Sequence, residues 1–178
     1  MNAHVHSELA EPVTRHDHVR GPHRAPVTLV EYGDIECPYC GQAHSILRAL
    51  EQEMEGQLRF VFRHFPLTTI HPFAEHASEA AEAAGAQGKF WEMHDLLFEN
   101  QDALSDEDLV TYSAELNLDA RRVANDIVTG AHAARIGHDI DTGLRSEVDG
   151  TPMFFINGKK YNGDLELYAM LEALQAEL

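Results

Sequence analysis

The feature that most constrains this chain is a pair of cysteines, Cys37 and Cys40, placed between a predicted strand and a predicted helix. Residues 27–32 are short and β-branched and follow a proline, which is typical of a buried strand. In residues 38–55, apolar side chains recur at spacings of three and four, which predicts an amphipathic helix. The sequence has no other cysteine. Its two thiols therefore lie at one strand-to-helix junction.

This placement predicts a chemistry for the two thiols. Pro38 suits the first helical turn, where its missing N–H costs nothing. Cys37 then lies beside unpaired backbone N–H groups at the positive end of the helix dipole, which favours the nucleophilic thiolate. Cys40 lies one turn further in, more buried and close enough to form a disulfide. We predict that Cys37 forms mixed disulfides with substrates and that Cys40 resolves them.

Two other interpretations of the cysteine pair are a pair of packed core residues and half of a zinc site. A zinc site needs about four ligands, and the chain has no second C-x-x-C and no regular histidine pair. His44 lies one turn beyond Cys40 and is expected to be an exposed helix residue. We therefore predict a redox pair that uses neither a metal nor a cofactor.

Glu31 is the unusual residue of the first predicted strand, because it shares a face with Val27 and Leu29. A buried carboxylate is costly unless it is paired or used. The functional interpretation is a proton acceptor for Cys40 during exchange. The alternative is an edge position at which Glu31 reaches solvent.

Further strands are predicted at residues 57–65 and 153–156, and Asn157-Gly158 predicts a hairpin turn into a returning strand at residues 159–161. The helices predicted after the first one cover residues 72–86, residues 89–100, a segment capped by Ser105, a segment between Asp119 and Gly130, a segment marked by Ile136, Ile140, Leu144 and Val148, and a closing segment marked by Leu167, Tyr168, Leu171, Leu174 and Leu178. This order predicts an α/β fold with a central mixed sheet flanked by helices.

The same order predicts how the chain is divided. Residues 25–65 and 150–178 are expected to form one discontinuous α/β domain, and residues 66–149 an all-helical insertion. Residues 1–24 are expected to be a flexible arm without a signal peptide, which predicts a cytoplasmic protein if Met1 is the natural start. A sequence trimmed of its signal would instead belong to a periplasmic or extracellular protein. Five histidines of the arm invite a metal interpretation, but a solvated arm is favoured: His4, His6, His16, His18 and His23.

The charge of the chain limits its partners. Thirteen basic and 30 acidic residues give a net charge of −17. Such a surface repels phosphate backbones and anionic lipid heads, so we expect no nucleic-acid partner and no direct membrane contact. The sequence has no apolar run of roughly 18 residues, the length that spans a membrane. The strong charge also favours a monomer.

Five segments in this order resemble the DsbA-like branch of the thioredoxin superfamily. They are Ala25-Pro26-Val27-Thr28-Leu29-Val30-Glu31-Tyr32, Asp34-Ile35-Glu36-Cys37-Pro38-Tyr39-Cys40, Phe62-Arg63-His64-Phe65-Pro66, Gly88-Lys89-Phe90-Trp91-Glu92-Met93-His94, and Gly150-Thr151-Pro152-Met153-Phe154-Phe155-Ile156-Asn157-Gly158. The resemblance covers roughly residues 17–178. Similar domains also occur fused to some sodium/proton antiporters.

The resemblance implies a thioredoxin fold with a helical insertion and assigns roles to several residues. It implies that Cys37 is a surface nucleophile, that Cys40 is the resolving thiol and that Glu31 is the buried acid below them. Pro152 falls at the family's cis-proline position, and Thr151 precedes it at the specificity position. The residues assigned to substrate binding are Pro38, Tyr39, Thr151 and Pro152.

The expected function is thiol–disulfide exchange with protein or small-thiol substrates and a redox partner. The best-known relatives are exported oxidants, so the absence of a visible export signal leaves the direction of electron flow open. One alternative is a glutathione-dependent transferase or isomerase on the same scaffold, although those relatives typically carry a lone serine. The other alternative is a non-enzymatic metal carrier or chaperone-like module with an apolar patch. The candidate patch residues are Tyr39, Phe65, Leu67, Ile70 and Phe73.

Overall fold

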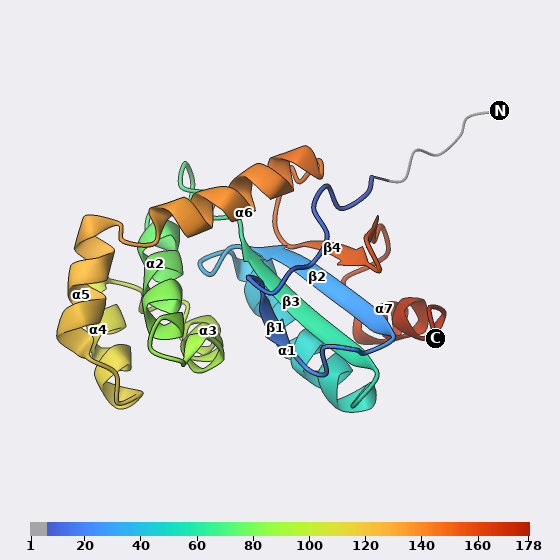
Figure 1. Ribbon diagram of the computed structural model, residues 1–178, viewed down its shortest axis with the longest axis horizontal. Helices are drawn as coiled ribbons and strands as arrows, with labels where there is room; N and C mark the ends of the chain where they lie inside the picture. The colour runs from blue at the N-terminus through green and yellow to red at the C-terminus, as the bar shows by residue number, and fades with distance from the viewer. Residues whose placement is uncertain (1–6) are drawn as a thin grey trace.

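A computed structural model describes residues 7–178 and shows a five-stranded sheet with helices around it (Figure 1). The strands are β1 (His18–Arg20), β2 (Val27–Gly33), β3 (Leu58–His64), β4 (Met153–Ile156) and β5 (Lys159–Lys160). They lie in the order β1-β3-β2-β4-β5, with β2 and β3 parallel and the other neighbours antiparallel. The predicted α/β fold with a mixed sheet is confirmed.

Seven helices connect and cover these strands within residues 7–178. They are α1 (Pro38–Glu53), α2 (Ala74–Gly85), α3 (Phe90–Glu99), α4 (Asp106–Glu115), α5 (Ala120–Thr129), α6 (Ala133–Arg145) and α7 (Leu167–Gln175). The predicted caps of two helices are present. Ser105 forms a capping box with Asp108 at the start of α4, and Asp119 accepts the N–H of Arg122 at the start of α5. These local signals fix where each helix begins.

Strand β2 is buried on both faces, so its side chains join two cores. Val27 and Leu29 pack into the core shared with α1 and α7. Val30 and Tyr32 face the opposite side, where the N-terminal segment and α6 cover the sheet. In Figure 1, α2 to α5 lie together beside the sheet, and α6 runs from this group toward it. The carboxyl end of β2, where α1 begins, therefore lies in the middle of the molecule.

Strand β1 is not predicted by the sequence, and the expectation of a flexible arm is wrong for residues 18–20. This segment pairs antiparallel with β3. Val19 is its only apolar side chain, and His18 and Arg20 are held by distant charged partners, so no hydrophobic alternation marks the strand. His18 Nε2 lies 2.7 Å from Glu82 Oε1, and Arg20 donates to Glu51 and Asp95. His4 and His6 lie outside the described residues.

Two predicted apolar faces also differ from the structure. On α7 the buried side chains are Met170 and Leu174, whereas Tyr168 is 82% exposed. On α6, Leu144 is exposed and Gly143 is buried, because Gly143 lies against the ring of Phe65. Within residues 7–178, none of the helices is both long enough and apolar enough to cross a membrane.

Candidate active site

The cysteine pair lies where the sequence predicts it, at the junction of β2 and α1. Cys37 is the N-cap of α1, with extended backbone angles, and Pro38 is the first helical residue. The backbone N–H of Cys37 donates to Asp34 O at 3.1 Å, and Gly41 N–H donates to Cys37 O at 3.1 Å. These bonds form a tight turn that places the Cys37 side chain over the first turn of the helix.

Both cysteines are free thiols and both are largely covered. Cys37 is 3% exposed and Cys40 is 1% exposed. The resemblance implies a surface nucleophile, and the structure corrects this: only a small part of Cys37 reaches solvent. Tyr39, between the two cysteines, is 63% exposed. Tyr39 is therefore the exposed side chain of the motif, beside a nearly covered Cys37.

The environments of the two thiols drive their acidities apart. A hydrogen bond from the Cys40 thiol, the contact with Thr151 and the backbone N–H groups of Cys40 and Tyr39 together outweigh burial and lower the pKa of Cys37 to about 5. Burial, the hydrogen bond to Cys37 and the charge of Glu31 raise the pKa of Cys40 well above its ordinary value. A thiolate at Cys37 next to a thiol at Cys40 is the arrangement that exchange chemistry requires.

The loop before β4 lies directly against Cys37. The Thr151–Pro152 peptide bond is cis, and the Cys37 Sγ lies 3.5 Å from Thr151 O. The Thr151 hydroxyl is buried and has no hydrogen-bond partner among residues 7–178. A hollow of about 190 Å³ opens on this side of the site. Its lining consists of Tyr39, Thr151, Pro152, Met153, Phe154, Tyr161, Gly163 and Leu165.

Glu31 lies in the middle of β2, between Phe62 of β3 and Phe154 of β4. It is 1% exposed, so the interpretation of an edge position in solvent is wrong. Its Oε1 is buried with no hydrogen-bond partner in the described part of the chain. Burial and the charge of Cys37 outweigh the attraction of Arg20 and raise the pKa of Glu31 to about 8. This carboxyl is therefore poised to exchange a proton near neutral pH.

Gly33 is required by the closeness of Glu31 to its neighbours. A Cβ built on Gly33 would lie 2.9 Å from Glu31 Oε1 and 2.4 Å from the ring of Phe62. Any other residue would push the buried carboxyl or the Phe62 ring out of place. The glycine after Tyr32 thus makes room for the buried acid.

Three residues that the sequence analysis did not select also hold the site: Asp34, His71 and Gln101. Asp34 is fully buried at the end of β2, and its N–H points to Cys40 Sγ at 3.4 Å. His71 Nδ1 lies 2.7 Å from Asp34 Oδ2. Gln101 Nε2 donates to Ile35 O at 2.7 Å and to Cys37 O at 2.8 Å. Asp34 lies three residues before Cys37 in sequence, but no local pattern marks the other two.

His44 is buried rather than exposed, which corrects its predicted position. Its ring stacks on Phe98, and its ligand atom lies within 4.8 Å of those of His94 and Asp95. Arg20 donates to Asp95 Oδ2 at 2.7 Å, so this carboxylate already has a cationic partner. Within residues 7–178, neither cysteine belongs to a comparable group of three metal-ligating side chains.

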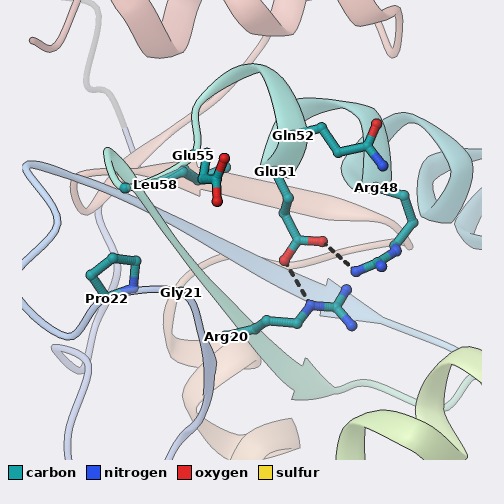
Figure 2. A pocket seen from close by; sticks show the side chains of 9 residues that line it. Arg20, Gly21, Pro22, Arg48, Glu51, Gln52, Glu55 and Leu58 are labelled. Atoms are coloured by element: carbon teal, nitrogen blue, oxygen red, sulfur yellow. Dashed lines mark hydrogen bonds and ion pairs between the residues drawn. The ribbon is translucent and has the colours of Figure 1, made fainter.

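A larger hollow, of about 590 Å³, lies at the other end of α1 (Figure 2). Three of its charged side chains are paired with one another, because Arg20 and Arg48 donate to Glu51 at 2.7 and 2.9 Å. Unlike the smaller hollow, it is lined neither by Tyr39 nor by any residue of the Thr151 loop. We therefore place the candidate active site at the smaller hollow beside Cys37.

The fold and the cysteine site together define a protein of the thioredoxin class. A family model described as Thioredoxin matches residues 13–176, and the chain belongs to this family.

Several solved structures share this fold. Oxidised BdbD from Bacillus subtilis superposes with a TM-score of 0.87 at 21% identity, covering 97% of this chain and 98% of BdbD. The α-DsbA1 protein of Wolbachia pipientis superposes with a TM-score of 0.79 at 22% identity, covering 93% and 92%.

Curated relatives are considerably longer than this chain. The Na(+)/H(+) antiporter NhaA 1 of Salinispora arenicola is 50% identical over 158 residues, which cover 89% of this chain and 24% of the antiporter. An NhaA antiporter of Herminiimonas arsenicoxydans is 39% identical over 160 residues, or 90% of this chain and 25% of that protein. The chain thus spans about a quarter of the length of these relatives.

Proposed function

We propose that this protein is a thiol–disulfide oxidoreductase whose Cys37–Cys40 pair exchanges with cysteines of polypeptide substrates. The observation that carries the proposal is the position of the cysteine pair at the start of α1, against the Thr151–Pro152 loop, and the acidities follow from it. The pKa of Cys37 is lowered to about 5, whereas that of Cys40 is raised. The reactive thiolate and the resolving thiol are thereby distinguished before any substrate arrives.

The first step is attack of the Cys37 thiolate on one sulfur of a substrate disulfide. The substrate S–S bond breaks, a Cys37–substrate disulfide forms, and the second substrate sulfur leaves as a thiolate that takes a proton from solvent. Cys40 then loses its proton and attacks Cys37 Sγ. The mixed disulfide breaks, the Cys37–Cys40 disulfide forms, and the first substrate sulfur leaves. The substrate is reduced by two electrons, and the same steps in reverse oxidise a dithiol.

Glu31 is the proposed acceptor of the Cys40 proton. Its buried carboxyl raises the pKa of Cys40 through its charge, so the two groups interact across the space between β2 and α1. With its own pKa raised to about 8, Glu31 is basic enough to accept a proton and acidic enough to return it. This role explains why a carboxyl without a hydrogen-bond partner at Oε1 lies buried beneath the cysteine pair.

The hollow beside Thr151 supports an extended, apolar segment as the substrate. Tyr39, Pro152 and Leu165 give it an apolar lining, and the Thr151 backbone lies next to the attacking Cys37 sulfur. A substrate strand laid along residues 151–153 would bring its cysteine to Cys37 and a neighbouring apolar side chain into the hollow. The net charge of −17 favours neutral or basic segments.

The test is to trap the mixed disulfide. The Cys40→Ser variant, incubated with a peptide that contains one disulfide flanked by apolar residues, should accumulate a covalent adduct through Cys37. The Cys37→Ser variant is the matched control and should form none. Mass spectrometry of the intact protein measures both. Absence of any adduct with the Cys40→Ser variant would refute the proposal, and cysteine-independent turnover with glutathione would favour a transferase.

The direction of electron flow follows from the reduction potential in glutathione buffers. A potential near the roughly −270 mV of thioredoxin would identify a reductase, in agreement with the predicted cytoplasmic location. A potential near the roughly −120 mV of strong oxidants would identify a disulfide donor of an oxidising compartment. In either direction the protein requires a redox partner that restores its starting state.

A further inference from the structure

Asp34 connects the two cysteines through its backbone. Its N–H points to Cys40 Sγ at 3.4 Å, and its carbonyl accepts the N–H of Cys37 at 3.1 Å. Its side chain is also fully engaged: Oδ1 accepts the N–H of Glu36 and Oδ2 accepts the N–H of Leu67, both at 2.8 Å. This residue therefore holds the active-site loop against the segment that follows β3.

A fully buried carboxylate in this position works against the proposed chemistry. Asp34 is 0% exposed and lies three residues before Cys37, within the same turn. A like charge that water does not screen disfavours formation of a thiolate nearby. Pro38 and Tyr39, the residues between the cysteines, carry no positive charge that could offset it.

His71 supplies that positive charge from the segment between β3 and α2. Its Nδ1 lies 2.7 Å from Asp34 Oδ2, and its side chain is 16% exposed. The charged groups that face it are Asp34, Glu36 and the Cys37 sulfur. Burial lowers the pKa of His71, but the hydrogen bond to Asp34 and these three negative groups raise it overall, which favours the imidazolium.

We infer that His71 is a positioning residue for exchange: as an imidazolium bound to Asp34, it cancels the field of that carboxylate at Cys37 and anchors the loop. The inference rests on the proposed function of Cys37. His71, 34 positions away from Cys37 in sequence, thereby keeps the Cys37 sulfur charged. The distance in sequence explains why no motif marks it.

The charge and the hydrogen bond of His71 are separable. In His71→Asn the amide nitrogen occupies the place of Nδ1, so the bond to Asp34 is kept while the charge is lost. His76→Asn is the matched control, because His76 forms an exposed pair with Asp106 at 2.6 Å. The ultraviolet absorbance of the thiolate, followed against pH in the reduced proteins, reports the pKa of Cys37.

We expect the pKa of Cys37 to rise by about one unit in His71→Asn and to stay unchanged in His76→Asn. A less acidic Cys37 stabilises the reduced protein less. The glutathione equilibrium should therefore shift about tenfold toward the disulfide form, which corresponds to about 30 mV. An unchanged thiolate titration in a folded His71→Asn protein would overturn the inference.

A second measurement uses the unmodified protein. Because coupling is reciprocal, a Cys37 thiolate must stabilise the His71 imidazolium as much as it is stabilised. Nuclear magnetic resonance titration should therefore give a higher His71 pKa in the reduced than in the disulfide form, and equal values would overturn the inference. If the wild-type protein formed no mixed disulfide, the proposed function would be refuted. The role of His71 would still be tested, because the thiolate titration of Cys37 needs no substrate.

Discussion

The side-chain amide of Gln101 donates to the backbone carbonyl of Cys37 at 2.8 Å, and to that of Ile35 at 2.7 Å. Gln101 follows the end of α3, so one side chain ties this helix to the loop that carries the nucleophile. The contact requires a glycine on the facing side: a Cβ on Gly41 would lie 2.0 Å from Gln101 Oε1. The first turn of α1 and the end of α3 therefore fit together only with a glycine at position 41 and a glutamine at position 101.

Replacing Gln101 by glutamate should loosen this loop. Glu has the same shape but offers no N–H, so two carbonyls lose their donor and face a carboxylate instead. We expect a loss of about 1–3 kcal/mol in the free energy of unfolding, measured by urea denaturation, and a higher pKa of Cys37.

Gly41→Ala should have a related effect, because its methyl group displaces the Gln101 amide. If both substitutions act through one contact, the double variant should be less destabilised than the sum of the two single variants. Strict additivity would show that Gln101 and Gly41 act independently.

The acidity of Cys37 should depend on the thiol of Cys40. The hydrogen bond from Cys40 is the largest cause that lowers the pKa of Cys37 to about 5. Cys40→Ala removes the donor and should raise that pKa, whereas Cys40→Ser keeps an O–H donor and should preserve much of the effect. The pH dependence of Cys37 alkylation measures both variants. Identical profiles for the two would contradict this assignment.

The candidate site divides into a part that the sequence predicts and a part that it does not. Pro38 and the apolar periodicity after it mark the start of α1, and Glu31 is conspicuous because its strand is otherwise apolar. These signals lie within a few residues of the groups they concern. They predicted the junction, the helix and the burial of the acid, because short-range sterics and hydrophobic burial determine all three.

The remaining contacts join segments that are far apart in the chain. Gln101 binds the Cys37 loop from 64 residues away, and His18 binds Glu82 across the same number. Gln101 and Glu82 are ordinary residues in their local context, because many turns carry a glutamine and many helices a glutamate. Strand β1 has no local signal for the same reason, since two of its three side chains, His18 and Arg20, are held by long-range polar contacts.

Glu31→Gln should stabilise the protein in a defined pH range. The pKa of Glu31 is raised from 4.5 to about 8 in the folded state, so folding favours the protonated carboxyl. Wild-type stability should then fall as the pH rises between these values, by about 1.4 kcal/mol per pH unit. Below pH 4.5 the penalty is absent. The Glu31→Gln variant avoids the penalty at every pH, because its amide does not ionise.

Thermal or urea unfolding across pH tests this expectation, and equal pH profiles for the two proteins would refute it. The same variant should resolve mixed disulfides more slowly, because Cys40 loses its proton acceptor. Stopped-flow measurement of substrate release from the Cys37 adduct separates this kinetic effect from the gain in stability.

Glu82 should anchor the N-terminal edge of the sheet. Its Oε1 lies 2.7 Å from His18 Nε2 of β1 and 2.9 Å from His64 Nε2 of β3, and the His18 ring stacks on Phe90. Burial raises the pKa of Glu82, but the bonds to His18 and His64 outweigh it and lower the pKa overall. A lowered pKa in the folded state stabilises the protein at any pH above 4.5, the ordinary pKa of a glutamate. This stability is lost only as the pH falls through the pKa of Glu82 in the folded protein.

Glu82→Gln keeps the shape of the side chain and removes its charge. We therefore expect the free energy of unfolding to fall by about 2 kcal/mol above pH 4.5. The difference from the wild-type protein should become smaller in stronger acid. Glu92→Gln, at an exposed position of α3, is the control and should change little. Hydrogen exchange should accelerate at the β1 amides in particular, because His18 loses its charged partner there. A Glu82→Gln protein as stable as the control would mean that stacking on Phe90, and not the ion pair, holds β1 to the sheet.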